Sequence, residues 1–272
     1  MDLPTQAEIE REINREQIAE YRLMDNEFMQ AFFHENIPCT QKMVRVILSR
    51  TDVKVISSNG EYHMPNLRGH SVILDVHAID ERGREFGFEV QRADEGAKPK
   101  RARYDSSLMD ANYPNPGKYA KNLPEIWTVF IVEHDVLGLG LPIYIIERTI
   151  TGKGRNKLFG DGSHIIYVNV SIQDDTPLGR LAHDFTCKDP NEMYDRDFAE
   201  RARYLKETER GVETMTKRME ERIEKVREET RRETVREFAR NMIEDNEPFD
   251  KVVKYSRLSL DEVQKLAGKS LV

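Results

Sequence analysis

The chain has 272 residues, of which 38% are hydrophobic and 33% are charged, and its formal net charge is −7. This length predicts one large domain or one domain with an appendage, and the apolar content suffices for a sizeable core. The acidic total excludes a protein that is basic throughout, although a local basic patch can coexist with it.

The first part of the chain predicts helices followed by short strands. Apolar residues recur every three to five positions over about 5–33, which is typical of a helix, and Pro38 interrupts this pattern. A second helix is predicted over about 40–50, with Thr40 as its N-cap. Short strands are predicted to follow, the first of them over 52–57.

The strongest local signal is a β-hairpin. Two extended runs, SVILDVHAID (71–80) and REFGFEVQ (84–91), are separated by three residues that end in Gly83. A three-residue hairpin loop requires a left-handed residue at its third position, which glycine adopts without steric cost. We therefore predict two antiparallel strands joined by a tight loop.

More strands and two helices follow the hairpin. A helix is predicted over 98–112, and the apolar run at 125–133 is typical of a strand buried on both faces. Further strands are predicted at 141–150 and 163–172, and Thr176-Pro177 is expected to begin a short helix. This order predicts an α/β fold, a central mixed sheet flanked by helices, rather than a repeating βαβ array.

The character of the chain changes from about residue 196. Residues 196–246 predict one long charged amphipathic helix, whose single apolar stripe must pack on its own domain or form a short dimeric coiled coil. Residues 247–272 predict a small helix-turn-helix-like tail, in which Ser259 and Glu262 have capping-box spacing. The chain thus divides into 1–195, the long helix and the tail.

The predicted hairpin brings carboxylates together. If the loop is three residues long, Asp80 pairs with Arg84, and counting five residues back and forward sets Asp75 opposite Glu89. Directly paired residues point to one face of a sheet, and Gln91 shares the face of Glu89. Three polar groups are therefore predicted to converge on neighbouring strands.

Two interpretations of these carboxylates remain open. A bound Mg²⁺ would relieve the repulsion between two ionised carboxylates and could activate water for phosphodiester cleavage. Alternatively, the strands carry one solvated face on which Asp75, His77, Glu85 and Glu89 are simply wet. On the pattern alone the solvated face is the commoner case.

The arrangement resembles the PD-(D/E)XK nuclease core, with an Asp in one strand, Glu-x-Gln in the next and a basic helix behind. More narrowly, the chain resembles the PD-(D/E)XK nuclease family transposases, the Rpn-like recombination-promoting nucleases of bacteria. The resemblance covers about residues 20–190, and it is carried by MDNEFMQAFF (24–33), the hairpin segment 71–94, KRARYDSSLMD (100–110) and the later strands LPIYIIERTI and SHIIYVNVS.

The resemblance implies a restriction-endonuclease-like core in residues 1–195 and a bacterial source. A cytoplasmic location is expected because the charged N-terminus lacks the apolar stretch of a signal peptide. The resemblance also implies hydrolysis of DNA with Mg²⁺ or Mn²⁺ as cofactor, in recombination or transposition. Asp75 and Glu89 would be catalytic residues that bind the metal, Gln91 would be a third catalytic residue, and Asp25 would support the metal site. Glu27 is a less favoured substitute for Asp25.

Gln91 departs from the general pattern, which has Lys at this position. Either a nearby cation replaces the lysine, with Lys98, Lys100 and Arg101 as candidates, or the enzyme is weak or inactive. Gln at this position is itself usual in the Rpn-like group, which favours the first option. Arg101 and Tyr104 resemble the arginine and tyrosine of the family's helix, and Lys98, Lys100 and Arg103 are expected to contact DNA phosphates with them.

Two rival functions remain. The fold could be retained as a DNA-binding module without cleavage, or the long helix could dominate in a structural protein that forms a homodimer through it. We expect no membrane partner, because no run approaches the roughly 20 apolar residues that span a bilayer. Cys39 and Cys187 are expected to be reduced, since their spacing suggests neither a disulfide nor a metal site.

Overall fold

The computed structural model describes residues 5–66, 70–113, 122–153 and 155–270. The chain divides into two compact units, Met1–Thr216 and Lys217–Val272. The first unit is a mixed α/β structure built on a six-stranded sheet with helices around it, as the sequence predicted. The second unit, in the described part, is helical.

The central sheet has the strand order β1-β2-β3-β4-β8-β5. The inner pairs β3–β4 and β4–β8 are parallel, whereas β1–β2, β2–β3 and β5–β8 are antiparallel. A separate two-stranded ribbon is formed by β6 and β7. The strands are β1 (Val55–Met64), β2 (Val72–Asp80), β3 (Glu85–Gln91), β4 (Ile126–Val132), β5 (Ile143–Ile146), β6 (Thr149–Gly152), β7 (Arg155–Leu158) and β8 (Ser163–Asn169).

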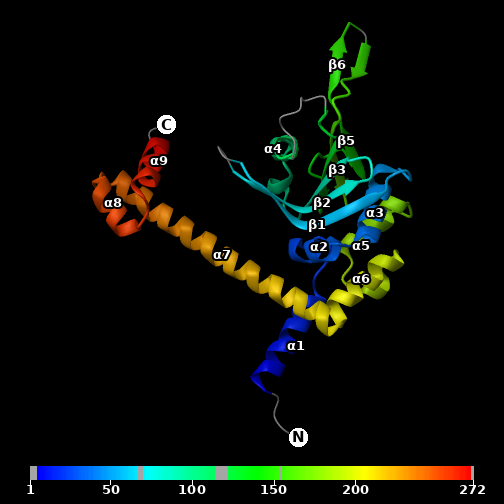
Figure 1. The fold of residues 1–272 in the computed structure, drawn as a ribbon, viewed down its shortest axis with the longest axis horizontal. Helices are drawn as coiled ribbons and strands as arrows, with labels where there is room; N and C mark the ends of the chain where they lie inside the picture. The colour runs from blue at the N-terminus through cyan, green and yellow to red at the C-terminus, as the bar shows by residue number, and fades with distance from the viewer. Residues whose placement is uncertain (1–4, 67–69, 114–121, 154, 271–272) are drawn as a thin grey trace. The chain divides into compact units, whose positions relative to one another are not determined.

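Helices cover both faces of the sheet (Figure 1). One face carries α4, which contacts β4 and β8; the other carries α2 and α3, which contact β1 and are backed by α5 and α6. The helices of this unit are α1 (Gln6–Ala19), α2 (Asn26–Phe33), α3 (Ile37–Leu48), the 3-10 helix η1 (Asp94–Ala97), α4 (Pro99–Ala111), α5 (Pro177–Thr186), the 3-10 helix η3 (Pro190–Glu192) and α6 (Arg196–Glu207).

The predicted hairpin is confirmed in loop and register. Gly83 has φ +76°, the left-handed conformation that the loop requires, and the Asp80 amide donates to the Arg84 carbonyl at 3.1 Å. The pairing of β2 with β3, continued by one residue, sets Asp75 across from Glu89. The sequence therefore predicted correctly which carboxylates the two strands bring together.

The solvated-face interpretation of this hairpin is wrong. Its polar side chains are almost fully buried, because helices pack on both sides of the sheet. The exposed fraction is 2% for Asp75, 3% for His77, 7% for Glu85 and 2% for Glu89. His77 Nε2 lies 2.9 Å from Glu85 Oε2, and its ring stacks on Tyr62. These polar groups are therefore interior groups, whose charge must be balanced by partners inside the protein or by a bound ion.

The predicted helix over 5–33 is instead two helices. Residues 20–25 leave the helical conformation, and Asp25, at the N-cap of α2, is extended with φ −99° and ψ 122°. Its Oδ2 accepts a hydrogen bond from the Arg22 amide at 2.8 Å, which stabilises the turn that separates α1 from α2. The apolar spacing could not reveal this break because it continues through the turn.

Two further boundaries differ from the prediction. The helix α3 begins at Ile37 rather than near residue 40: Asn36 is its N-cap, accepting from the Cys39 amide at 3.4 Å, and Pro38 lies in its first turn. Thr40 is not the N-cap but a buried residue inside the helix. The predicted strand over 141–150 is divided, because β5 pairs with β8 and β6 leaves the sheet to pair with β7.

The predicted single helix over 196–246 is interrupted at Thr208. This residue is extended with ψ 148°, and its Oγ1 accepts from the Gly211 amide at 3.1 Å, as an N-cap does. A Cβ on Gly211 would lie 1.9 Å from the Tyr204 carbonyl oxygen, so only glycine allows this close approach. The segment therefore forms α6, packed in the first unit, and then α7 (Glu209–Glu244).

The second unit contains the later part of α7 with α8 (Phe249–Ser256) and α9 (Leu260–Ser270). The predicted capping box is present: Glu262 Oε2 accepts from the Ser259 amide at 2.9 Å, and Ser259 Oγ lies 3.3 Å from the Glu262 amide. A small apolar cluster holds the three helices together, formed by Ala239, Val252, Val263 and Leu266.

The apolar stripe of α7 is only partly covered. Met215 is fully buried, whereas Ile223, Val226 and Phe238 are 49%, 41% and 48% exposed. Dimerisation through this helix therefore stays a prediction, which light scattering tests. In the described residues, no helix combines the length and the apolar character needed to cross a membrane.

Candidate active site

Asp75 lies near the middle of β2, and both of its carboxylate oxygens are held. Oδ1 accepts from Gln30 Nε2 of α2 at 3.1 Å, and Oδ2 accepts from the Val90 amide of β3 at 2.9 Å. Burial raises the pKa of Asp75 to about 6, although these hydrogen bonds and the positive charge of Arg101 oppose the rise. The side chain is thus fixed in place and kept out of water.

Glu89 lies across from Asp75 in β3, and its two oxygens differ in their surroundings. Oε2 accepts from Gln91 Nε2 at 3.2 Å and from Arg101 Nη2 at 3.0 Å. Oε1 is buried and has no hydrogen-bond partner among the described residues. Burial, and next the negative charge of Asp75, raise the pKa of Glu89 well above its ordinary value.

Arg101 brings a positive charge to this pair of carboxylates from α4. Its guanidinium lies between Glu89 and a third buried acid, Asp105, with Nε 3.5 Å from Asp105 Oδ2. Burial raises the pKa of Asp105 to about 6, against the opposing effect of Arg101. One cation therefore faces several acids in a low-dielectric environment, where an unbalanced negative charge is costly.

Gln91 is positioned by close packing against η1. A Cβ added to Gly96 would lie 1.8 Å from Gln91 Oε1 and 3.3 Å from Arg101 Nη1. Glycine at this position therefore lets the Gln91 amide and the Arg101 guanidinium reach Glu89 together. Figure 1 shows α4, the helix that contains Arg101, over one face of the sheet.

The other basic residues predicted near the site have different surroundings. Lys98 is exposed and lies 2.5 Å from Glu95 Oε2, and Lys100 and Arg103 are exposed on α4. The Tyr104 hydroxyl donates to the His70 carbonyl at 2.5 Å and accepts from Asn66 Nδ2 at 2.7 Å, which ties α4 to the segment between β1 and β2. Of the predicted cations, Arg101 is the one that contacts Glu89.

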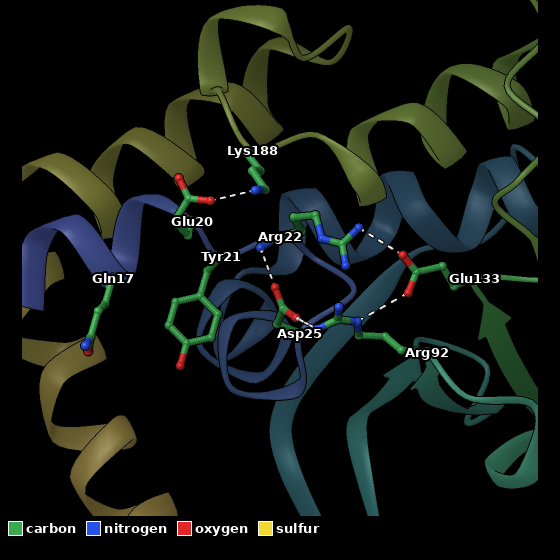
Figure 2. Close-up of a pocket in the computed structure, with 8 residues that line it drawn as sticks. All are labelled: Gln17, Glu20, Tyr21, Arg22, Asp25, Arg92, Glu133 and Lys188. Atoms are coloured by element: carbon green, nitrogen blue, oxygen red, sulfur yellow. Dashed lines mark hydrogen bonds and ion pairs between the residues drawn. The ribbon is translucent and has the colours of Figure 1, made fainter.

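Asp25 lies in a neighbouring polar pocket of about 490 Å³ (Figure 2). Its Oδ1 accepts from Arg92 Nη1 at 2.9 Å, and Arg92 also reaches Glu133 at 3.3 Å. Arg22 bonds the other oxygen of Glu133 at 3.0 Å. The figure shows the Arg92 guanidinium between the two carboxylates, so the structure places Asp25 in an ion-pair network at the ends of β3 and β4.

Glu27, in the first turn of α2, has a closer electrostatic connection to the carboxylate pair. Its negative charge is among the causes that raise the pKa of Asp75, whereas that of Asp25 is not among those resolved. Glu27 is half-buried on the same helix as Gln30, which contacts Asp75 directly. The start of α2 therefore has two acids: Asp25, which is bound by Arg92, and Glu27, whose negative charge acts on Asp75.

Comparison with known protein families identifies this arrangement. The model of the PD-(D/E)XK nuclease family transposases matches residues 22–255. The chain belongs to this family. The match includes the Asp75–Glu89 hairpin, the helix with Arg101, all of α7 and most of α8. No curated protein and no solved structure matches the chain significantly.

Membership of the PD-(D/E)XK nuclease family transposases supports a nuclease-like function, that of a hydrolase acting on DNA. PD-(D/E)XK nucleases generally use divalent metals. In the described residues, no three His, Cys, Asp or Glu side chains are grouped as a metal-binding cluster. A metal in this site would therefore depend on two carboxylates and on oxygens from water or substrate, which is a usual way of binding Mg²⁺.

The residues present fit a hard divalent cation. Within the described ranges of the chain, Glu89 Oε1 is buried without a hydrogen-bond partner, and each oxygen of Asp75 accepts one hydrogen bond, which leaves lone pairs free. Carboxylate oxygens are the ligands that Mg²⁺ and Mn²⁺ prefer. A cation between Asp75 and Glu89 would also balance the charge repulsion that raises the pKa of Glu89.

Two residues of this site were missed by sequence reasoning. Gln30 was part of a matching segment but gave no separate signal, although a polar residue among apolar neighbours in NEFMQAFF could have drawn attention. Asp105 lies four residues after Arg101, a spacing that places both on one face of a helix. Neither contact can be inferred from the strand register.

Proposed function

We propose that the chain is a metal-dependent DNA endonuclease that hydrolyses phosphodiester bonds with Mg²⁺, or with Mn²⁺ in its place. Asp75 and Glu89 would hold the metal. The observation that carries this proposal is a buried pair of carboxylates with raised pKa values, in which Glu89 Oε1 has no partner among the described residues. A protein interior tolerates such a pair when a cation neutralises it.

The side chains around the carboxylate pair would orient a water molecule and the substrate phosphate. The Gln91 amide, 3.2 Å from Glu89, can hold a water at the edge of the site without supplying charge. Arg101 supplies the charge: its guanidinium has donors to spare for a substrate phosphate while it contacts Glu89. When bound, the metal would lower the pKa of a water and stabilise the leaving oxygen.

The remaining assignments follow from position and charge. Glu27 is the better candidate for a supporting acid, because its negative charge acts on Asp75. Exposed Lys98, Lys100 and Arg103 would contact DNA phosphates along α4.

We assign the endonuclease activity to residues 1–195, and roles in assembly or binding to residues 196–246 and 247–272. Recombination or transposition is the setting that family membership favours.

The test is nicking of supercoiled plasmid by the full chain with Mg²⁺ or Mn²⁺. Asp75→Asn and Glu89→Gln should each lose cleavage, because both remove a charged metal ligand. Glu89→Gln is nearly isosteric and removes a negative charge that burial disfavours. It should therefore fold about as well as the native chain in the absence of metal, because Arg101 keeps Asp105 as an acidic partner.

The matched control is Glu95→Gln, which removes the same charge from a side chain that is 83% exposed. This variant should cut like the native chain. Cleavage that survives both site variants would exclude the proposed site. DNA binding by the native chain without cleavage in either metal would support the rival function, a DNA-binding module of the same fold.

A further inference from the structure

A groove of about 560 Å³ lies inside the second unit, between α7 and the turn that joins α8 to α9. Residues of α7 spaced by three and four positions form one wall, since this spacing places side chains on one face of a helix. The charged residues that line the groove are Glu228, Arg231, Arg232, Arg236, Arg257 and Glu262.

The groove has more positive than negative charge, and its two acids are already engaged. Glu228 Oε1 accepts from Arg232 at 3.1 Å. Hydrogen bonds from Ser259 and, more weakly, the charge of Arg236 hold the pKa of Glu262 below its usual range.

Three further guanidinium groups line the groove, those of Arg231, Arg257 and Arg236, the last of which acts on Glu262 only through its charge. In the part of the chain that the structure describes, none of them has a carboxylate within ion-pair distance. Like charges that share one groove repel each other, and an anion bound between them would relieve that repulsion.

Arg257 occupies a backbone position that does not favour its side chain. It ends α8 in the left-handed conformation, with φ +61°, where its amide donates to the Val253 carbonyl. Glycine is the usual residue at such a helix end, because a Cβ is unfavourable there. The fold of the turn therefore does not explain an arginine, whereas a role for its guanidinium at the groove does.

We propose that this groove binds the phosphate backbone of DNA. Guanidinium groups match phosphate oxygens with two parallel hydrogen bonds, and a polynucleotide presents phosphates in series to several arginines. Residues 217–272 contain 14 Lys and Arg against 13 Asp and Glu, while residues 1–216 contain 28 against 36. The second unit is therefore the part of this acidic chain on which a polyanion meets the least repulsion.

This inference rests on the proposed function for its choice of ligand, and it adds a DNA contact outside the catalytic site. The family model ends at residue 255, so Arg257 and Glu262 lie beyond the matched segment. Contacts to phosphates alone carry no base information, so binding in this groove is independent of DNA sequence. Its strength falls with salt, because each phosphate contact releases counterions.

The test is fluorescence anisotropy of a labelled DNA duplex with the full chain, over a series of salt concentrations. All proteins carry Glu89→Gln and are measured in EDTA, so that neither cleavage nor metal binding affects the result. The test variant combines Arg231→Ala, Arg236→Ala and Arg257→Gly. These changes suit an exposed helix and a left-handed helix end, so the fold should persist, which circular dichroism checks.

The control variant combines Arg218→Ala, Arg222→Ala and Arg227→Ala, which remove three charges from α7 outside the groove. The test variant should bind DNA at least about tenfold more weakly than the parent at 100 mM salt. In a plot of log binding constant against log salt concentration, the magnitude of its slope should be smaller by up to about 3, because each lost phosphate contact lowers it by roughly 0.9. The control should bind like the parent.

Unchanged affinity and slope in the test variant would overturn the inference, and so would an equal loss in the control. If the parent binds poly-L-glutamate as tightly as DNA, and the test variant loses both, the groove recognises an acidic protein surface instead. A chain that fails to cut plasmid but shows the expected binding loss would contradict the proposed nuclease and leave the groove assignment standing.

Discussion

Arg101 Nη2 of α4 lies 3.0 Å from Glu89 Oε2 of β3. This contact supplies, from a helix, the positive charge that a lysine at position 91 would supply from the strand. Gln91 contacts the same carboxylate oxygen, so the neutral amide and the charged guanidinium divide between them what one lysine would do. The departure from the general pattern at position 91 is therefore compatible with activity.

Arg101→Gln should lower the cleavage rate by about 100-fold or more, since one charged donor to a developing anion is worth about 3 kcal/mol. Adding Gln91→Lys to this variant should restore part of the loss, because the lysine returns the charge to the same carboxylate. Single-turnover cleavage at saturating Mg²⁺ measures both effects. Arg103→Gln is the matched control from the exposed side of α4 and should have a smaller effect.

If Gln91→Lys fails to rescue Arg101→Gln while both proteins stay folded and bind DNA, the idea of a divided lysine role is wrong. Arg101 would then act through its contact with Asp105 or by fixing α4.

Gly96→Ala should reduce activity while changing stability little. A Cβ at this position would meet Gln91 Oε1 at 1.8 Å, and this atom is the end of a flexible side chain that can rotate away. The rotation would remove the hydrogen bond from Gln91 to Glu89 and disturb Arg101. We expect a lower cleavage rate with a nearly unchanged melting temperature; equal activity would show that the position of Gln91 is not needed.

Without metal, the contribution of Asp75 and Asp105 to the free energy of unfolding should increase as the pH falls from 7 towards 4. Both pKa values are raised to about 6, so the native state binds protons more tightly than the unfolded chain. A rise of about two units is worth up to about 3 kcal/mol for each buried group. Urea unfolding in EDTA at pH 7 and pH 5 measures the gain.

Asp105→Asn should show a smaller gain on acidification than the native chain, since one of the titrating groups is gone. With saturating Mg²⁺ the sign should reverse: the metal requires ionised carboxylates, so its stabilisation is lost as the pH falls through about 6. A native chain whose stability has the same pH dependence with and without Mg²⁺ would contradict the assignment of Asp75 as a ligand.

Asp25 and Glu27 can be distinguished by neutral substitutions. Glu27→Gln should weaken Mn²⁺ binding by roughly 10-fold, because the negative charge of Glu27 acts on Asp75. This is the lower end of the loss in metal affinity that is usual when a residue supporting a metal ligand is changed. Asp25→Asn should leave Mn²⁺ affinity within about threefold and destabilise the α1–α2 turn, since its carboxylate holds Arg92 and the Arg22 amide. Calorimetric Mn²⁺ titration decides, and the reverse order of effects would restore Asp25 as the supporting acid.

Local chemistry made the hairpin predictable. Its loop length, the left-handed Gly83 and the alternation of side chains together set the register, and the register placed Asp75 across from Glu89. The family model matches a range that includes this hairpin, in agreement with the resemblance of its sequence to the family. The fold class followed for a similar reason, because the apolar run of β4 is typical of an inner strand.

Contacts between distant segments were not predictable in the same way. The solvated-face interpretation failed because nothing in the alternation of β2 and β3 indicates that α4 covers the second face. The contacts of Gln30 with Asp75 and of Arg92 with Asp25 join α2 to the strands across 45 and 67 residues. The break at Thr208 depends on Gly211 approaching Tyr204, which helix propensity does not reveal.

The most direct test of the central claim is anomalous diffraction from crystals of the full chain soaked in Mn²⁺. The account predicts a peak within bonding distance of Glu89 and Asp75, with Glu89 Oε1 as a ligand, and its absence in crystals of Glu89→Gln. A peak at Asp25 and Glu133 instead, or no peak while Arg101 keeps its contact with Glu89, would contradict the assignment of this carboxylate pair as the metal site.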